Sequence, residues 1–201
     1  MLRRHKIFYS LITLFIGLFF FTSGPVWADE ITDSIEEAME YYKKGDFVEA
    51  ANSLDYASQL IRQKRSGNLE GFLPNPLSGW TAEDIKSQAA GTGVLGGMIS
   101  VNRTYRKNQS SIKIEIIVDS PGIQSMIMVL SNPAYASAGG GKLTRIKNQK
   151  AIIKYLESGK NGEINIVVAK KYLVNVEGRN IGKNDLVDYA SSIDYNKLEK
   201  F

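Results

Sequence analysis

Four carboxylates in the second half of the chain are the residues best suited to hydrolytic chemistry. They lie within or at the ends of segments in which apolar and polar residues alternate, as in half-buried strands: Glu115, Asp119, Glu163 and Glu177. A sheet that brought two of them together could supply the acid and the base, or the nucleophile, of a hydrolase. Charged strand residues usually face solvent, so we favour four solvent-facing carboxylates.

Two motif-like stretches lack the context that their chemistry needs. Ser110 and Lys113 have the S-x-x-K spacing of Ser–Lys acylating enzymes, but in an alternating segment residues three apart point to opposite faces. Residues 136–145, ASAGGGKLTR, contain Gly-Lys but have Leu143 where a phosphate-binding loop needs Ser or Thr. Neither stretch predicts an acylating or nucleotide-binding site.

Histidine and cysteine are nearly absent. The chain has no Cys, and its single His is His5. Without them the rest of the chain has no Cys or His zinc ligands, no Cys nucleophile, no disulfide and no Ser-His triad. We therefore expect no catalytic residue of these kinds, no metal site and no cofactor.

Residues 1–28 have the layout of a secretory signal peptide. A basic start precedes an uncharged apolar run over 7–21, and a small-x-small cleavage site follows at 26–28. The run is shorter than the ~20 residues that a membrane-spanning helix needs. We expect cleavage after Ala28, a periplasmic or secreted chain, and no integral membrane span.

Removal of this segment also changes the charge. It takes away three of the 25 basic residues and none of the 21 acidic ones, which leaves a formal net charge of +1. A nucleic-acid-binding protein needs a clustered basic face. We expect no nucleic-acid partner.

Residues 29–65 predict an antiparallel helical hairpin. Apolar residues recur at helical spacing on both sides of a Gly45-Asp46 break. The two stripes are Ile31, Ile35, Ala38, Met39 and Tyr42 before the break, and Phe47, Ala50, Ala51, Leu54, Ala57 and Ile61 after it.

This hairpin resembles a single tetratricopeptide repeat. The resemblance rests on an aromatic late in the first helix, Gly and an aromatic at the turn, and Ala, a bulky apolar residue and Ala in the second helix: Tyr41, Gly45, Phe47, Ala50, Leu54 and Ala57. It departs from the repeat where Ser34, Glu37 and Ala38 replace Trp, Leu and Gly, and where Arg62 replaces Pro. The alternative is an ordinary helical hairpin.

A lone repeat of this kind cannot bury its apolar face by itself. We therefore expect the hairpin to pack on its own domain, on a second copy in a dimer, or on another envelope protein. Tyr41 is a candidate residue for such a contact.

The rest of the chain predicts a linker and an α+β domain. Residues 66–93 are rich in Gly and Pro and predict a linker with a short helix at 81–88. Residues 94–201 predict a mainly antiparallel sheet of about six strands, with two helices packed on one face. The order of these elements loosely resembles the Mog1/PsbP-like group.

Three residues near this junction are candidates for binding a ligand. Arg103 and Tyr105 could bind an anionic or polar ligand, but they share a strand face with Ile99, so packing against the core is the favoured interpretation. Trp80 could be a binding aromatic or could attach the linker to the core.

Together these features predict an exported, non-enzymatic binding or scaffold protein of the bacterial cell envelope. One alternative is a small exported hydrolase that uses carboxylates or Lys, which a polar cleft with paired acids would favour. Another is a sensor or assembly factor that recognises envelope polymers through residues 102–107 and Trp80.

Overall fold

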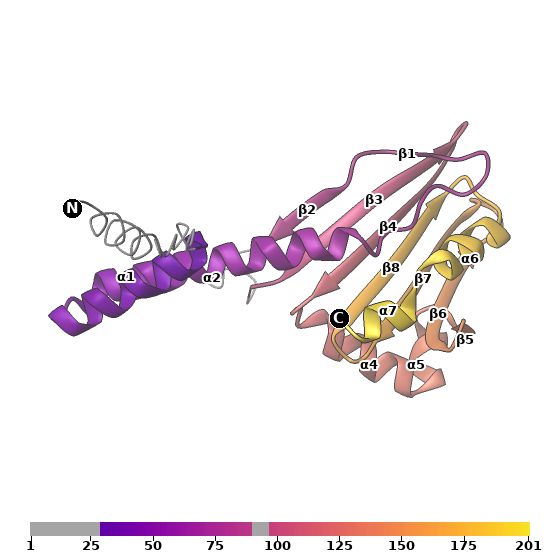
Figure 1. The fold of residues 1–201 in the computed structure, drawn as a ribbon. Coiled ribbons are helices and arrows are strands. Elements are labelled where there is room, and N and C mark those ends of the chain that lie inside the picture. The colour runs from indigo at the N-terminus through magenta and orange to yellow at the C-terminus, as the bar shows by residue number, and fades with distance from the viewer. Residues whose placement is uncertain (1–28, 90–96) are drawn as a thin grey trace, which may run out of the picture.

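The computed structural model describes residues 29–89 and 97–201 (Figure 1). The predicted signal peptide lies outside these residues. An N-terminal helical hairpin projects from an antiparallel sheet that carries further helices (Figure 1). The predicted α+β class is confirmed.

The hairpin turns where the sequence breaks. Helix α1 (Glu30–Lys44) ends at Gly45, whose φ of 81° glycine adopts without strain. Asp46 caps α2 (Phe47–Glu70), because its carboxylate accepts a hydrogen bond from the Glu49 backbone N–H at 3.3 Å.

Small side chains form the contact between the two helices. The buried residues of this seam are Ser34 and Ala38 on α1 and Ala50, Ser53 and Ala57 on α2. Their size lets the helices approach closely. The larger residues of the predicted apolar stripes lie outside the seam.

Helix α2 continues to Glu70, past the predicted end of the hairpin. Its last turns bury Ser66 and Leu69 against β2 (Lys86–Ala89) and β3 (Ile99–Lys107). Burial of Leu69 stabilises the helix in a stretch whose other residues are mostly polar. The base of α2 is thus part of the domain.

The prediction of a short helix at 81–88 is wrong. The chain there forms β1 (Thr81–Ala82) and β2, and both pair antiparallel with β3. The outer edge of β3 would otherwise present unpaired backbone N–H and C=O groups. Pairing with this edge overrides the local helical preference.

All six predicted strands form, and β1 and β2 raise the count to eight. The other strands are β4 (Ser110–Val118), β5 (Lys142–Ile146), β6 (Gln149–Leu156), β7 (Asn161–Val168) and β8 (Tyr172–Arg179). The order is β1-β3-β4-β8-β7-β6-β5, with β2 beside β1 on β3. The sheet is antiparallel throughout.

One face of the sheet, the core face, carries the main hydrophobic core. Alternate residues of the central strands are fully buried there, for example Ile112, Ile114 and Ile116 of β4. Helices α6 (Lys183–Ser192) and α7 (Tyr195–Glu199) cover this face.

The expectation that the helices share one face is wrong. Helices α4 (Gly122–Ser131) and α5 (Pro133–Ala138) pack on the opposite face, where Leu130 and Ala136 contact Ile152. Helices α4 and α5 shield the apolar side chains of β5, β6 and β7 at that end of the sheet from water. The rest of the opposite face is polar.

The core face comes close to α6 at a pair of glycines. Gly162 and Gly178 are register partners on β7 and β8. A Cβ atom on Gly178 would lie 2.8 Å from Ile181 Cγ1 and 3.2 Å from Leu186 Cδ1. The contact with Ile181 is closer than packed carbon atoms come, and the contact with Leu186 requires that side chain to shift by a few tenths of an ångström.

We predict that Gly178→Ala destabilises the protein. Overpacking a filled core costs about 1–3 kcal/mol. The matched control is Gly67→Ala, because Gly67 lies in exposed α2 with no atom within 4 Å of an added Cβ, and this change should add roughly 0.5–1 kcal/mol. Denaturant unfolding of both variants measures whether each change lowers or raises the free energy of unfolding. If Gly178→Ala were as stable as Gly67→Ala, the close approach of α6 to Gly178 would be contradicted.

Tyrosines of the core must stay protonated in the folded protein. The Tyr195 hydroxyl donates to the Ala190 carbonyl oxygen at 2.6 Å, and burial raises the pKa of Tyr195. In the unfolded chain a tyrosine loses its proton near pH 10. Above that pH the folded state holds more protons, so stability falls as pH rises.

We predict that the free energy of unfolding decreases as pH rises above about 10, at up to ~1.4 kcal/mol per pH unit for each such tyrosine. Tyr195→Phe should be less stable at pH 7, because it loses the hydrogen bond, and should show a shallower decrease. Guanidinium unfolding at a series of pH values from neutral to strongly alkaline gives both slopes. Identical slopes would show that Tyr195 does not contribute.

Candidate functional site

The hairpin exposes a row of large apolar side chains. We call this surface the apolar side; it consists of Ile35, Met39 and Tyr42 on α1 and Phe47, Leu54 and Ile61 on α2, and each side chain is 38–66% exposed. Exposed apolar surface of this extent is unusual in a protein that acts alone.

The six side chains lie on one side of the hairpin. Ile35, Met39 and Leu54 each directly follow a seam residue, which rotates them by about 100° from the seam. Because the helices run antiparallel, the same rotation turns both stripes to the same side. At the tip, the rings of Tyr42 and Phe47 meet edge to face at 5.7 Å and join the two stripes.

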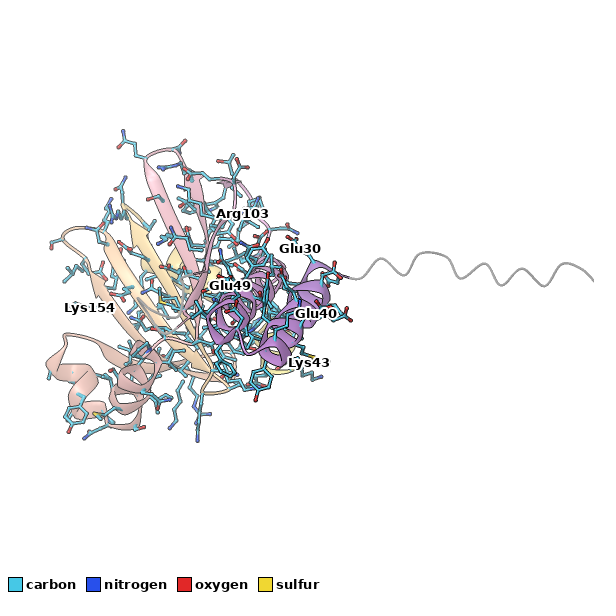
Figure 2. All side chains as sticks on the ribbon, turned by 90° about the vertical axis from the view of Figure 1, so that its left-hand side faces the viewer. Glu30, Glu40, Lys43, Glu49, Arg103 and Lys154 are labelled. Atoms are coloured by element: carbon cyan, nitrogen blue, oxygen red, sulfur yellow. The ribbon has the colours of Figure 1, made fainter. Side chains whose placement is uncertain are left out.

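The other side of the hairpin is acidic. This acidic side carries Glu30, Asp33, Glu36, Glu37 and Glu40 of α1, and Glu49 of α2. Two of its carboxylates bond across to α2: the Tyr56 hydroxyl donates to Glu30 at 2.6 Å and the Ser53 hydroxyl to Glu37 at 3.4 Å. Figure 2 shows Glu30, Glu40 and Glu49 on the projecting helices. The hairpin is therefore amphipathic across its width.

The sheet domain leaves this hairpin uncovered. Helix α1 packs mainly on α2, and only the end of α2 meets β2 and β3. In Figure 1, α1 and the start of α2 extend beyond the sheet. The sequence led us to expect one of three partners for the apolar side: the chain's own domain, a second copy or another envelope protein. In the described residues, the chain's own domain does not cover it.

A second candidate surface is the polar part of the sheet face opposite the core, which we call the polar face. Glu163 of β7 and Glu177 of β8 are direct register partners there. They line an open hollow of about 620 Å³, together with Lys154, Asn175 and Arg179. The hollow is polar and has two acids on its wall, which is the feature that the hydrolase alternative predicts.

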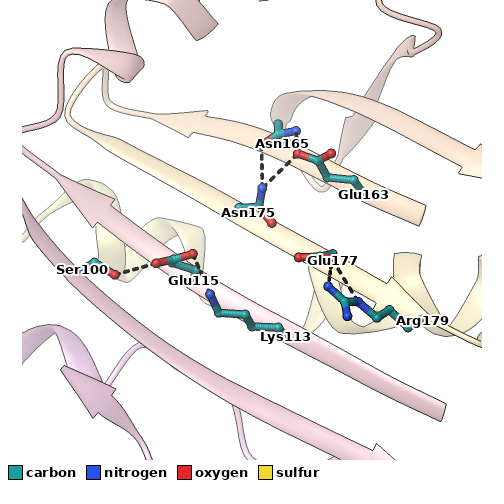
Figure 3. Close-up of polar contacts among 8 residues, drawn as sticks. All are labelled: Ser100, Lys113, Glu115, Glu163, Asn165, Asn175, Glu177 and Arg179. Atoms are coloured by element: carbon teal, nitrogen blue, oxygen red, sulfur yellow. Dashed lines mark hydrogen bonds and ion pairs between the residues drawn. The ribbon is translucent and has the colours of Figure 1, made fainter. Parts of the chain in front are cut away.

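Both carboxylates of this pair already accept hydrogen bonds (Figure 3). The Glu163 carboxylate accepts from Asn165 at 2.5 Å and from Asn175 at 3.0 Å. The Glu177 carboxylate accepts from the Arg179 guanidinium at 3.0 Å. A general acid needs a carboxyl that keeps its proton, usually in a site shielded from water, whereas this hollow is open.

The remaining two carboxylates do not join the pair. Glu115 of β4 accepts from the Ser100 hydroxyl at 2.6 Å and from Lys113 Nζ at 3.0 Å (Figure 3). Asp119 forms an ion pair with Arg65 at 2.7 Å and attaches α2 to the end of β4. The sequence therefore predicted the polar positions, but register selects Glu163 and Glu177.

The structure places two of the predicted binding residues in the core. Trp80 is 8% exposed and Tyr105 is 0% exposed, and both rings contact Tyr189. The Tyr105 hydroxyl donates to the Pro74 carbonyl oxygen at 2.7 Å, and burial raises the pKa of Tyr105. These rings attach the chain after α2 to the sheet.

The other two predicted binding residues lie apart from each other. Arg103 is half-buried, and its Nε donates to the Glu83 carbonyl oxygen at 2.8 Å. Tyr41 is half-buried on α1, with Lys44 Nζ 5.7 Å from its ring centre. The four predicted residues therefore do not form one exposed site.

Sequence reasoning missed the apolar side as a surface. It grouped the large and small apolar residues into stripes and did not separate the seam from the exposed side chains. The available signal was the spacing of the small residues, since Ser34 and Ala38, and Ser53 and Ala57, lie four apart on their helices. Small residues at this spacing allow helices to pack closely.

Two further observations concern metal-binding clusters and membrane-spanning helices. In 29–89 and 97–201, no cluster of three or more His, Cys, Asp or Glu side chains could hold a metal ion. No helix in those ranges has the length and apolar character needed to cross a membrane. Compared with family models, with curated proteins and with solved structures, the chain has no match.

Proposed function

We propose that the protein is an exported, non-enzymatic binding protein of the bacterial cell envelope that docks through its hairpin. The observation that carries this proposal is the apolar side, six large side chains left exposed on a projecting element. Burying them against another protein would recover the hydrophobic free energy that the chain alone forgoes. Export rests on the signal-peptide layout of residues 1–28.

The domain is suited to hold the hairpin in place. The Ser66 and Ser87 hydroxyls lie 2.8 Å apart, and the Ser87 hydroxyl also bonds to Glu70 at 2.9 Å. The ion pair between Arg65 and Asp119 adds a third contact at the base of α2. A docking surface on a firmly attached element loses less conformational freedom on binding.

We predict that a photo-crosslinking amino acid at Leu54 captures a protein partner in cells that export this chain. The matched control places the same amino acid at Glu49, five residues before Leu54 and on the acidic side of α2. Adducts should form from position 54 and be far weaker from position 49. No adduct from either position, with both variants folded, would contradict docking through the apolar side.

The paired acids support a second candidate, a small exported hydrolase. Glu163 and Glu177 are register partners that line one hollow, and glycosidases cleave glycosidic bonds with a pair of carboxylic acids.

Under this second function, Glu163→Gln and Glu177→Gln should each slow release of reducing ends from envelope glycans by about 100-fold or more, the usual contribution of an acid or base. Gln can still accept the hydrogen bonds that Glu163 accepts, so the fold should persist. Glu115→Gln, on the same face but outside the pair, is the control. Equal rates in all four proteins would remove this candidate.

A further inference from the structure

We propose that the partner on the apolar side is a second copy of this chain, and that two hairpins pack antiparallel across a two-fold axis as a four-helix bundle. This proposal rests on the docking function above and names its partner. Spacing, area and charge on the hairpin carry it.

The apolar side has the spacing of a helix-bundle contact. Phe47, Leu54 and Ile61 lie seven residues apart on α2, and Ile35 and Tyr42 lie seven apart on α1. Repeats of seven keep the same side of a helix facing its partner over its whole length. The spacing thus suits helices that pack along the hairpin rather than across it.

A small residue between the large ones leaves room for a partner's side chain. Ala51 of α2 is exposed on the apolar side, four residues after Phe47, whereas the hydroxyl of Ser58, four residues after Leu54, accepts a hydrogen bond from the Arg62 guanidinium at 2.7 Å. In a two-fold contact the same sequence meets itself, so a large side chain of one copy can enter the space beside Ala51 of the other. This alternation is how bundle layers interdigitate.

The exposed area is close to what a stable dimer needs. Six large side chains that are one-third to two-thirds exposed present on the order of 100 Å² each, or about 600 Å² per copy. A standard interface buries about 800 Å² per partner, and flanking polar residues supply the remainder.

Charge at the flank of the apolar side selects the antiparallel arrangement. Glu36 and Lys43 are exposed seven residues apart on the outer side of α1, where the acidic side that Glu36 helps to line borders Met39. An antiparallel two-fold pairing centred near Met39 sets Glu36 of one copy beside Lys43 of the other. Such flanking pairs set the orientation of bundled helices.

The parallel arrangement brings like charges together. It would place α1 of one copy over α2 of the other, with both tips at the same end. Glu36 lies nine residues before Gly45 and Asp55 ten residues after it, so both are about 14 Å from the turn at 1.5 Å per residue. Two carboxylates would then meet across the interface.

A membrane surface fits the hairpin less well. Helices that lie in the membrane interface usually carry Lys and Arg on their polar face, which attract anionic lipids. The side of this hairpin opposite its apolar residues is acidic instead. Repulsion from anionic lipid would oppose insertion.

The first test uses analytical ultracentrifugation of residues 29–201 over a range of concentrations. The wild-type chain should sediment as a dimer, and Met39→Glu/Leu54→Glu should raise its dissociation constant by about 100-fold or more. Glu49→Lys, on the acidic side, is the matched control and should leave the dimer intact. A monomeric wild-type chain overturns the proposal.

The second test reads the orientation. Glu36→Lys and Lys43→Glu should each weaken the dimer, and the two changes together should restore it. Because the chain has no Cys, Met39→Cys provides a unique thiol that should form an intermolecular disulfide across the two-fold axis. Failure of both the charge rescue and the disulfide would overturn the antiparallel arrangement.

The two proposals fail in different ways. A monomeric purified chain that still gives an adduct of a different protein from position 54 would retain docking and remove self-association. A monomeric chain without any adduct would remove both. Circular dichroism and thermal unfolding of each variant show whether a lost dimer reflects a lost fold.

Discussion

The antiparallel register between β4 and β8 is the constraint on which the rest of the domain depends. It joins the strands before α4 to the strands that follow, and it pairs Ile114 with Val176 and Ile116 with Val174. A slip by one residue would turn the Ile and Val side chains of β4 outward and bring Lys113 and Glu115 into the core. The same register fixes the polar face and lets the close contact between Gly178 and α6 form.

The hairpin follows a different constraint, the small size of its seam residues. Ser34, Ala38 and Ala57 let α1 and α2 come close, but they bury little apolar area. The large apolar side chains have no place in so narrow a contact and remain outside it. In a hairpin with this seam the two helices pack on each other, but the large apolar side chains remain exposed to solvent.

The strands from β3 to β8 could be predicted because their alternation is strong and their core residues are β-branched. The two strands before them could not, because Thr81–Ala82 and Lys86–Ala89 are short and become strands only against the edge of β3. Helix α2 exceeded its predicted end for a similar reason, since burial of Leu69 stabilises a turn that its sequence alone does not favour.

The candidate sites show the same limit. Each carboxylate of the polar face could be assigned to the outside of a strand, but the pairing of Glu163 with Glu177 depends on how β7 meets β8. The sequence favoured the core for Tyr105 and left a ligand site open for both Trp80 and Tyr105, and the contact of both rings with Tyr189 places them in the core. Sequence pattern identifies a face, whereas register and packing decide which residues meet on it.

The two surfaces are connected by what self-association would do to the polar face. The apolar side lies on the projecting hairpin, and the hollow beside Glu163 lies on the sheet, so occupying one leaves the other free. A dimer joined at its hairpins would carry two polar faces on one particle. Two weak sites held together bind a repetitive polymer more tightly than either site alone, because the second contact forms at a high effective concentration. A hairpin that joins two sheet domains would therefore let a shallow polar surface bind a polymer that one copy alone holds too weakly.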